Sequence, residues 1–341
     1  MIVNQFPDRI IEVDQQPYLY FGGTAYLGMP TNSKFQELII KNIQRWGTAY
    51  GSSRNANIKL GAYESGEAFL SNYINAEAAV TVSSGMLAAK LAIAELRQQT
   101  DVFVHFPNCH TALQVEDSIP FLIGNEINPR LLNNTKEHIT LLTDAVASFT
   151  IAAVDLSLVQ QIHPNKEISL LIDESHSLGI LGNNGCGIYA SIDSKNIKRK
   201  IMVASLGKAM GVTGGVIASD NEFIKKINLH PVFVSSAGMN PAFIAAMAEA
   251  KEIYQEQHLK LKSNLHYVNS LLNNNEKLPF NQDYPIIYPE IHDINKILKN
   301  NRIIVTNFRY ATLGTDLNRI VFTANHTKED LEKISTVLNQ A

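Results

Sequence analysis

A lysine in an unusual setting is the first feature of this sequence that suggests chemistry. Lys208 lies in the segment SLGKAM, directly after an apolar run and shortly before a pair of glycines. Small neighbours leave its amine accessible, and burial beside a bound group favours the neutral amine that acts as a nucleophile. Most lysines are instead solvated surface residues. The setting predicts that Lys208 forms a Schiff base with a carbonyl compound.

Two residues that occur earlier in the sequence, Asp173 and His176, make pyridoxal 5'-phosphate (PLP) the expected carbonyl partner of this lysine. Asp173 ends the apolar run ISLLI, and His176 follows it in the next loop. PLP withdraws electrons only while its pyridine nitrogen is protonated, and a neighbouring carboxylate maintains that proton. His176 could donate to the phenolic oxygen of PLP. Without Lys208, either residue would more often be an ordinary loop residue, so the interpretation depends on the lysine.

Two further segments have features that PLP requires. Ser84, Gly85 and Met86 separate an apolar run from a helical pattern, and a helix N-terminus with a glycine and a hydroxyl suits a phosphate. In isolation the same segment is an ordinary helix cap. His110 follows the run DVFVHF, where its ring could lie on the pyridine. His105 and His110 lack the further ligands of a metal site, so no metal is expected.

The DESH sequence at 173–176 permits another interpretation, a nucleotide-hydrolysing motor. That function requires a phosphate-binding loop of the form GxxxxGK[ST]. The Gly-Lys pair at 207–208 has Met202 in place of the first glycine and Ala209 in place of the hydroxyl residue. The motor interpretation therefore lacks its essential partner.

Apolar runs of strand length alternate with helical patterns from about residue 76 to 220, which predicts an α/β domain. Most runs are continuous rather than alternating, as in a largely parallel sheet that is buried on both faces. Ligands of such sheets collect beyond the carboxyl ends of the strands, where the candidate residues lie. The expected strands are 79–82, 102–106, 121–123, 139–142, 168–172, 201–204 and 215–218.

The length of 341 residues predicts a large domain and a smaller one. We expect an N-terminal arm (1–45) that packs with the small domain, a large PLP-binding domain (46–230) and a small α+β C-terminal domain (231–341). In the small domain, the pattern predicts one long helix over about 242–272, strands at 303–308 and 319–323, and a last helix from about residue 328.

Charge and composition limit the classes of partner and the compartment. A net charge of −3 provides no electrostatic attraction to nucleic acid or an anionic membrane, so the expected partner is a small molecule. Two cysteines suit a reducing compartment and are too few for a disulfide framework. The N-terminus has no basic stretch followed by an apolar core. We expect a cytoplasmic protein.

The order and spacing of these pieces resemble the α-oxoamine synthases, fold-type-I PLP enzymes that include 8-amino-7-oxononanoate synthase and 2-amino-3-ketobutyrate CoA ligase. The resemblance runs from about Tyr18 to the C-terminus. Its pieces are Tyr26-Leu27-Gly28, GTAYGSSR from Gly47 to Arg54, Ser84-Gly85, His110, DESHS from Asp173 to Ser177, SLGK from Ser205 to Lys208, and a closing segment that contains Arg319.

The resemblance implies a role for each matched residue. Lys208 would be the Schiff-base lysine and the proton-transfer base, with Asp173 on the pyridine nitrogen, His176 on the phenolic oxygen and His110 stacked on the ring. Arg319 would bind the carboxylate of the substrate. The resemblance also implies a homodimer with the active site at the interface. The phosphate would contact Ser84, Gly85, Met86 and Ser205, together with Ser235 or Ser236 of the neighbouring subunit.

The implied reaction condenses an amino acid (alanine, glycine or serine) with an acyl-CoA, with loss of carbon dioxide, to an α-amino ketone. Departures from the family pattern, such as Thr24 where Asn is usual and Tyr63 within a segment that usually contains His, leave the acyl donor open. An aminotransferase or amino-acid lyase of the same fold type would share every cofactor residue. A protein that uses the fold only for binding or regulation is a further alternative, which the intact Lys208 and Asp173 disfavour.

Overall fold

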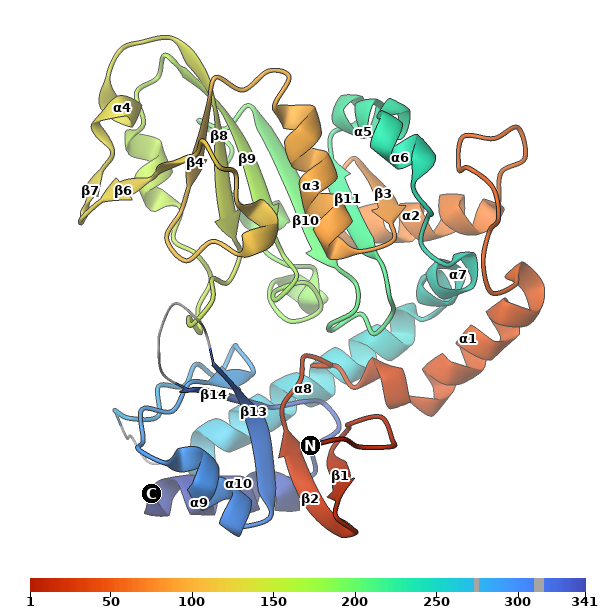
Figure 1. Cartoon of the computed structure of the whole chain (residues 1–341), viewed down its shortest axis with the longest axis vertical. Helices are drawn as coiled ribbons and strands as arrows, with labels where there is room; N and C mark the ends of the chain where they lie inside the picture. The colour runs from red at the N-terminus through yellow and green to blue at the C-terminus, as the bar shows by residue number, and fades with distance from the viewer. Residues whose placement is uncertain (273–275, 310–315) are drawn as a thin grey trace. The chain divides into compact units, whose positions relative to one another are not determined.

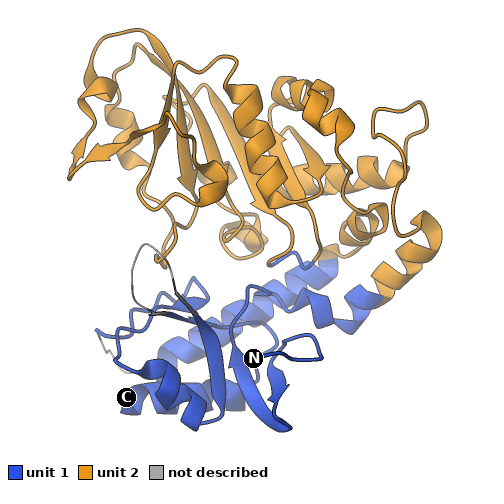
Figure 2. Ribbon diagram, viewed as in Figure 1, with its two compact units in different colours: residues 1–36, 209–211, 252–341 blue, residues 37–208, 212–251 orange. Residues whose placement is uncertain are grey.

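The computed structural model describes residues 1–272, 276–309 and 316–341 (Figure 1). The chain forms two compact units, which Figure 2 shows in different colours. Unit 1 contains residues 1–36, 209–211 and 252–341, and unit 2 contains residues 37–208 and 212–251. The segments 37–45 and 231–251 thus belong to unit 2, whereas the boundaries expected from the sequence were 45 and 231.

Unit 2 contains a seven-stranded sheet in which most neighbouring strands are parallel. Its order is β3-β11-β10-β9-β8-β4-β5, and β11 alone among them runs antiparallel to both of its neighbours. The strands are β3 (Ala78–Val82), β4 (Val102–His105), β5 (Ile119–Pro120), β8 (Glu137–Asp144), β9 (Lys166–Asp173), β10 (Arg199–Ser205) and β11 (Gly215–Ser219). The predicted α/β fold with a mostly parallel sheet is confirmed.

One predicted strand of this sheet is wrong. The run at 121–123 was expected in the main sheet, but the edge position is taken by β5 (Ile119–Pro120). Leu122–Ile123 (β6) instead pairs antiparallel with Glu126–Ile127 (β7) as a separate hairpin. Gly124 has a φ of 63°, which a hairpin turn requires and which glycine adopts without strain. Local turn chemistry therefore overrode the apolar pattern.

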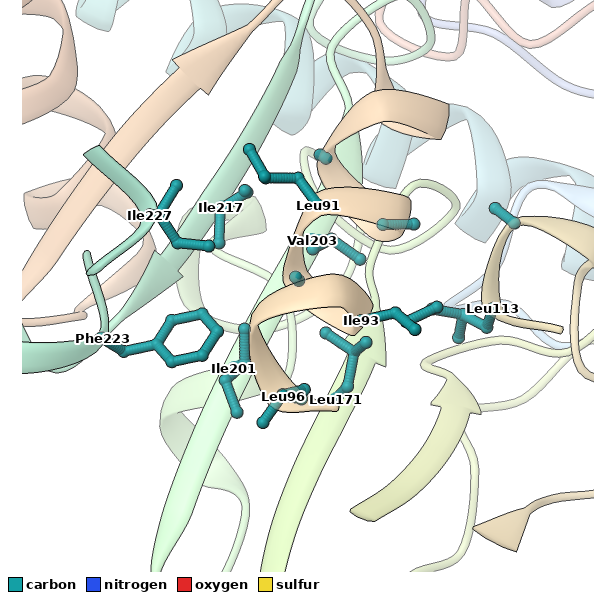
Figure 3. Close-up of a cluster of buried hydrophobic side chains, with 14 of the residues drawn as sticks. Leu91, Ile93, Leu96, Leu113, Leu171, Ile201, Val203, Ile217, Phe223 and Ile227 are labelled. Atoms are coloured by element: carbon teal, nitrogen blue, oxygen red, sulfur yellow. The ribbon is translucent and has the colours of Figure 1, made fainter. Parts of the chain in front are cut away.

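Helices α3 (Gly85–Leu96) and α5 (Asn221–Leu229) pack against the sheet of unit 2. Figure 3 shows side chains of α3, among them Leu91 and Leu96, close to sheet residues such as Ile201. Alanines at 88, 89 and 92 allow α3 to approach the strands closely, since they bury no long side chain. The core thereby fixes the N-terminus of α3 beside the carboxyl ends of the strands.

The structure corrects one of the helices predicted from the sequence. The expected single helix over 242–272 is interrupted at Ala250, whose φ and ψ of −97° and 14° are not helical, and Asn240 caps its first half. The helices are α1 (Ser33–Trp46), α2 (Gly61–Ile74), α4 (Pro129–Leu132), α6 (Pro231–Ser235), α7 (Pro241–Glu249), α8 (Lys251–Leu271), α9 (Ile294–Asn300) and α10 (Lys328–Gln340). Throughout the residues described, none of the helices is both long enough and apolar enough to cross a membrane.

Unit 1 joins the beginning of the chain to its end. Its five-stranded sheet has the order β1-β2-β13-β14-β12, and β2 pairs in parallel with β13. Part of the expected N-terminal arm, β2, therefore forms a strand beside the C-terminal segment, with residues 19–21 paired in parallel to residues 303–305. The strands are β1 (Ile10–Val13), β2 (Gln16–Phe21), β12 (Ile286–Ile287), β13 (Ile303–Arg309) and β14 (Asp316–Val321). Residues 209–211 also belong to unit 1, where Tyr254 donates a hydrogen bond to the Met210 carbonyl at 2.8 Å.

Candidate active site

The candidate site of unit 2 lies where three neighbouring parallel strands end. Asp144, Asp173 and Ser205 are the last residues of β8, β9 and β10. Asp144 is in register with Asp173, and Val203 of β10 is in register with Asp173 on the other side. Both aspartates are buried. Parallel pairing thus places two acids and a serine along one edge of the sheet, as expected for a ligand site.

The start of α3 contacts the end of β10. Ser84 caps the helix by accepting a hydrogen bond from the Leu87 N–H at 3.2 Å. A β-carbon added to Gly85 would lie 2.8 Å from the Cα, Cβ and N atoms of Ser205, so this approach requires glycine. Met86, the next residue, is partly exposed. The arrangement brings the positive end of a helix dipole and two hydroxyl residues together, which suits a phosphate.

Lys208 is half-buried in the loop between β10 and β11. Two backbone hydrogen bonds, from Leu206 N–H to the Gly214 carbonyl and from Val212 N–H to the Leu206 carbonyl, close this loop at 3.0 Å each. The charge of Lys208 lowers the pKa of both His110 and Asp144. The lysine is therefore an electrostatic neighbour of both groups.

His110 begins the turn after β4, and its backbone N–H donates to Asp144 Oδ2 at 2.7 Å. Its Nδ1 accepts a hydrogen bond from the Ala112 N–H at 3.2 Å, so Nδ1 carries no proton in this arrangement. Burial lowers the pKa of His110, Asp173 opposes that shift, and Lys208 adds to it. The imidazole of His110 is therefore neutral at neutral pH. A neutral ring suits stacking on an aromatic cofactor, because a charged ring would lose its hydration when the cofactor covers it.

Asp173 accepts a hydrogen bond from the Ser175 N–H at 2.8 Å, and Ser175 Oγ accepts one from the Ser205 N–H at 2.7 Å. These contacts connect the loop after β9 to the end of β10. His176 lies half-buried in the same loop. The structure therefore brings the predicted residues Ser84, Gly85, His110, Asp173, His176, Ser205 and Lys208 together within unit 2, while their individual roles stay predictions.

The sequence interpretation missed two buried acids. Glu174 is completely buried and accepts hydrogen bonds from the N–H groups of Ile188 and Tyr189, at distances down to 2.6 Å. It thereby anchors the loop that contains His176. Burial raises the pKa of Glu174 to about 7. The other acid, Asp144, ends the apolar run HITLLTD in the way that Asp173 ends its own run, and this parallel was the available signal.

The three remaining predicted residues belong to other elements of the fold. Ser235 ends α6 and is exposed, and Ser236 is the C-cap of the same helix. Arg319 belongs to unit 1, where it lies half-buried on β14 and donates from Nη2 to the Gly23 carbonyl at 3.3 Å. Its charge also acts on two buried phenols of unit 1, Tyr26 and Tyr284, by lowering their pKa values against the effect of burial.

The residues of unit 2 fit PLP in two respects. The close contact between Gly85 and Ser205 brings the N-terminus of α3, with Ser84, beside the end of β10, and a helix N-terminus with two hydroxyl residues suits the phosphate of PLP. The donor set combines a carboxylate, an amine and an imidazole, the groups that a protonated pyridine ring bearing an aldehyde requires. Within the described ranges, no group of three His, Cys, Asp or Glu residues could hold a metal ion.

Comparisons with known proteins agree with a PLP site in this fold. The model of the family "Aminotransferase class I and II" matches residues 126–338. The chain is 25% identical to 8-amino-7-oxononanoate synthase of Vibrio parahaemolyticus, over 97% of this chain and 90% of the relative. It is 26% identical to the protein of that name from Fervidobacterium nodosum, over 94% and 88%.

Solved structures show the same fold. A serine palmitoyltransferase of S. paucimobilis with bound PLP has a TM-score of 0.81 at 18% identity, with 99% of this chain and 91% of that chain covered. An 8-amino-7-oxononanoate synthase from Francisella tularensis has a TM-score of 0.72 at 21% identity, with 95% and 97% covered. The expected fold class is confirmed by these matches.

Proposed function

Because this chain belongs to the class I and II aminotransferase family, we propose that it is a PLP-dependent acyltransferase of the α-oxoamine synthase type. It condenses an amino acid with an acyl-CoA, releases the thiol and carbon dioxide, and yields an α-amino ketone. The observation that supports this most directly is the cluster of Lys208, Asp173 and His110 in unit 2, which also contains the contact between the start of α3 and the end of β10. The names of the full-length relatives support the acyl-transfer class.

Each residue of the cluster has one task in holding the cofactor. Ser84, Gly85 and Met86, at the start of α3, bind the phosphate together with Ser205. Asp173 accepts a hydrogen bond from the pyridine nitrogen. The uncharged ring of His110 lies on one face of the cofactor, and His176 donates to the phenolic oxygen. These tasks follow from the charge and position of the side chains.

When bound, PLP supplies an electron sink that stabilises negative charge on the α-carbon of the amino acid. Lys208 Nζ removes the proton from that carbon, and its position beside the cofactor provides the proximity that makes the abstraction feasible. Arg319 holds the carboxylate of the amino acid through its planar guanidinium. Asp173 would keep the pyridine nitrogen protonated, which the electron sink requires.

Thiol release is the decisive measurement. The purified protein, supplied with PLP, is incubated with alanine, glycine or serine and a panel of acyl-CoAs that includes pimeloyl-, acetyl- and palmitoyl-CoA. We expect free thiol with at least one pair and an α-amino ketone as the product. Lys208→Ala lowers the rate by more than about 1,000-fold, as loss of a residue at the centre of the chemistry does. The control is Lys225→Ala on α5, which changes an exposed lysine.

The same assay distinguishes the aminotransferase alternative, which shares the cofactor residues. Production of a keto acid with no thiol from any acyl-CoA would contradict acyl transfer and assign the chain to transamination. If no amino acid changes the absorbance of the bound PLP, the protein uses the fold only for binding or regulation and is not an enzyme of amino acids.

We also propose that the protein is a homodimer in which Ser235 or Ser236 contacts the phosphate of the neighbouring subunit. The exposed position of Ser235 at the end of α6 leaves it accessible to a second chain. Sedimentation of the PLP-loaded protein gives the mass of the assembly. Mixing Lys208→Ala with a Ser235→Ala/Ser236→Ala double variant tests the contribution across subunits, because a mixed dimer restores one intact site and exceeds the activity of either variant alone.

A further inference from the structure

Asp144 is a buried acid to which the proposed function assigns no task. It ends β8 and is in register with Asp173 at the end of β9. Only 5% of its surface is exposed. Neighbouring strands lie about 4.8 Å apart, so the two carboxyl groups share one small region at the edge of the sheet. Two acids this close in a buried setting need an explanation.

The contacts of Asp144 connect it to the segment that positions His110. The His110 N–H donates to Asp144 Oδ2 at 2.7 Å, and the Cys109 thiol is also hydrogen-bonded to this carboxyl group. The preceding residue, Asn108, has a φ of 57°, so the chain turns sharply before it meets Asp144. The backbone fixes the direction of the Cα–Cβ bond, so this contact places the base of the His110 side chain, whose ring Nδ1 accepts the Ala112 N–H.

The charged groups around Asp144 and its burial determine its protonation state. Asp173 faces it from β9, Lys208 from the loop after β10, and Cys109 and His110 from the segment after β4. Burial and the negative charge of Asp173 raise the pKa of Asp144 to about 7, although Lys208 and the His110 N–H act in the opposite direction. When two buried carboxyl groups share a site, repulsion keeps one of them protonated.

We propose that Asp144 is a positioning residue of the cofactor site, which orients His110 through its backbone N–H and, in the protonated form, leaves Asp173 as the single carboxylate beside the pyridine nitrogen. This inference rests on the proposed PLP site and not on the acyl-transfer reaction. The neutral form retains an acceptor oxygen for His110, so the two tasks are compatible.

Two variants of Asp144 separate the effect of its hydrogen-bond acceptor from the effect of its charge. Asp144→Asn keeps an acceptor oxygen and the size of the side chain but is always neutral, whereas Asp144→Ala removes the acceptor. PLP affinity of the cofactor-free protein is measured by absorbance titration near neutral pH. We expect Asp144→Asn to remain within about threefold of wild type and Asp144→Ala to weaken binding by about tenfold, the effect of one hydrogen bond to a buried group.

The control variants are Asp155→Asn and Asp155→Ala. Asp155 is an exposed aspartate of unit 2 that also accepts a backbone N–H, from Ser157 at 2.8 Å. Both changes should leave PLP affinity unchanged. Lys208→Ala is measured in parallel, because unaltered PLP binding and absorbance in that variant would contradict the proposed cofactor site itself, independently of Asp144.

A second readout requires neither activity nor the cofactor. Carbon-13 NMR of the aspartate carboxyl groups in the PLP-free protein should show one that titrates near neutral pH and that disappears in Asp144→Asn. The proposal is overturned if Asp144 titrates near the ordinary value of about 4, or if Asp144→Ala binds PLP as tightly as wild type. Equal weakening by both variants would show that a charged carboxylate is needed, which also contradicts it. If Asp144→Ala does not fold, Asp144→Asn and the titration decide.

Discussion

At the scale of single residues, the contact between α3 and β10 depends on the hydrogen atom that serves Gly85 as a side chain. A methyl group there would lie 2.8 Å from Ser205 backbone atoms, which cannot move aside without disturbing the strand. The site therefore has a sharp steric requirement at one atom. A chemically identical change elsewhere in the unit provides the comparison.

Gly85→Ala should weaken PLP binding by at least tenfold and destabilise the protein by about 1–3 kcal/mol, the range for an overpacked site. Gly61→Ala is the matched control, because Gly61 is likewise the first residue of a helix, α2, and a β-carbon there meets nothing within 4 Å. That change should be neutral or slightly stabilising. PLP titration and urea unfolding measure both effects. Similar behaviour of the two variants would contradict the steric argument.

Residues of an uncommon type in an uncommon setting could be identified from the sequence. Lys208 follows an apolar run among small residues, and this setting alone suggested its chemistry, whereas the interpretation of Asp173 depended on Lys208. Asp144 and Glu174 could not be assigned in this way, because their significance depends on tertiary neighbours. Asp144 matters through its register with Asp173 and its contact with the His110 N–H, and Glu174 through the distant turn at Ile188.

At the scale of elements, the loop after β9 is organised around Glu174. Its carboxyl oxygens accept two backbone N–H groups from the Ile188–Tyr189 turn and the hydroxyl of Ser177. A β-carbon at Gly187, whose φ is 82°, would lie 2.2 Å from Glu174 Oε2. The turn therefore has no room for a side chain at Gly187 while Glu174 occupies its present position.

Glu174→Gln should cost about 1–3 kcal/mol of stability, because an amide nitrogen would replace an acceptor and face backbone donors that are left without partners. Glu167→Gln is the control, since Glu167 has a more exposed side chain on β9 and pairs with Lys198 at the surface. Its expected cost is below about 1 kcal/mol. Urea unfolding of the cofactor-free proteins gives both values. An unchanged midpoint in Glu174→Gln would show that the loop is held by other contacts.

Element positions were easier to predict than element ends. The main strands were found because buried apolar runs are long and continuous, yet β8 and β9 extend to Asp144 and Asp173, beyond the apolar residues. The helix break at Ala250 has no proline or glycine to indicate it. Such ends depend on hydrogen bonds to distant partners, which periodicity does not reveal.

A buried histidine in the turn between β14 and α10 gives unit 1 a pH-dependent stability. His326 Nδ1 accepts the Thr323 N–H at 2.9 Å, and Nε2 lies 3.1 Å from the Tyr20 carbonyl. Burial lowers its pKa from 6.5 to about 4. The folded state thus binds a proton less readily than the unfolded chain. The stabilising contribution is complete above pH 6.5 and is lost as pH falls from 6.5 through about 4.

Lowering the pH from about 7.5 to about 5 should therefore cost the wild type about 2 kcal/mol through this residue alone. In His326→Gln that component disappears, so the variant loses less stability over the same interval although it is less stable at neutral pH. His292→Gln is the control, since the side chain of His292 is 94% exposed in the same unit. Urea unfolding at the two pH values tests the difference. An equal pH dependence in all three proteins would contradict it.

At the scale of the whole molecule, the chain begins and ends within the same unit. The parallel pair of β2 and β13 brings residues near position 20 beside residues near position 304. Phe21, the last residue of β2, is completely buried and stacks on the ring of His326, with ring centroids 4.0 Å apart. It also meets Phe322 edge to face at 5.9 Å. Residues near position 20 therefore form part of the core of unit 1 together with Phe322 and His326.

Phe21→Ala should destabilise unit 1 by about 3–5 kcal/mol, because it removes a large buried ring and leaves a cavity between segments that are distant in sequence. Phe6→Ala is the matched control in the same unit, where the side chain is 51% exposed, and its effect should stay within about 0.5 kcal/mol. The single tryptophan, Trp46, lies in unit 2, so its fluorescence reports on that unit while circular dichroism reports on both. An early circular dichroism transition that leaves the Trp46 signal in place would show that unit 1 unfolds first. Equal midpoints for Phe21→Ala and Phe6→Ala would show that the stacked rings do not hold the two ends together.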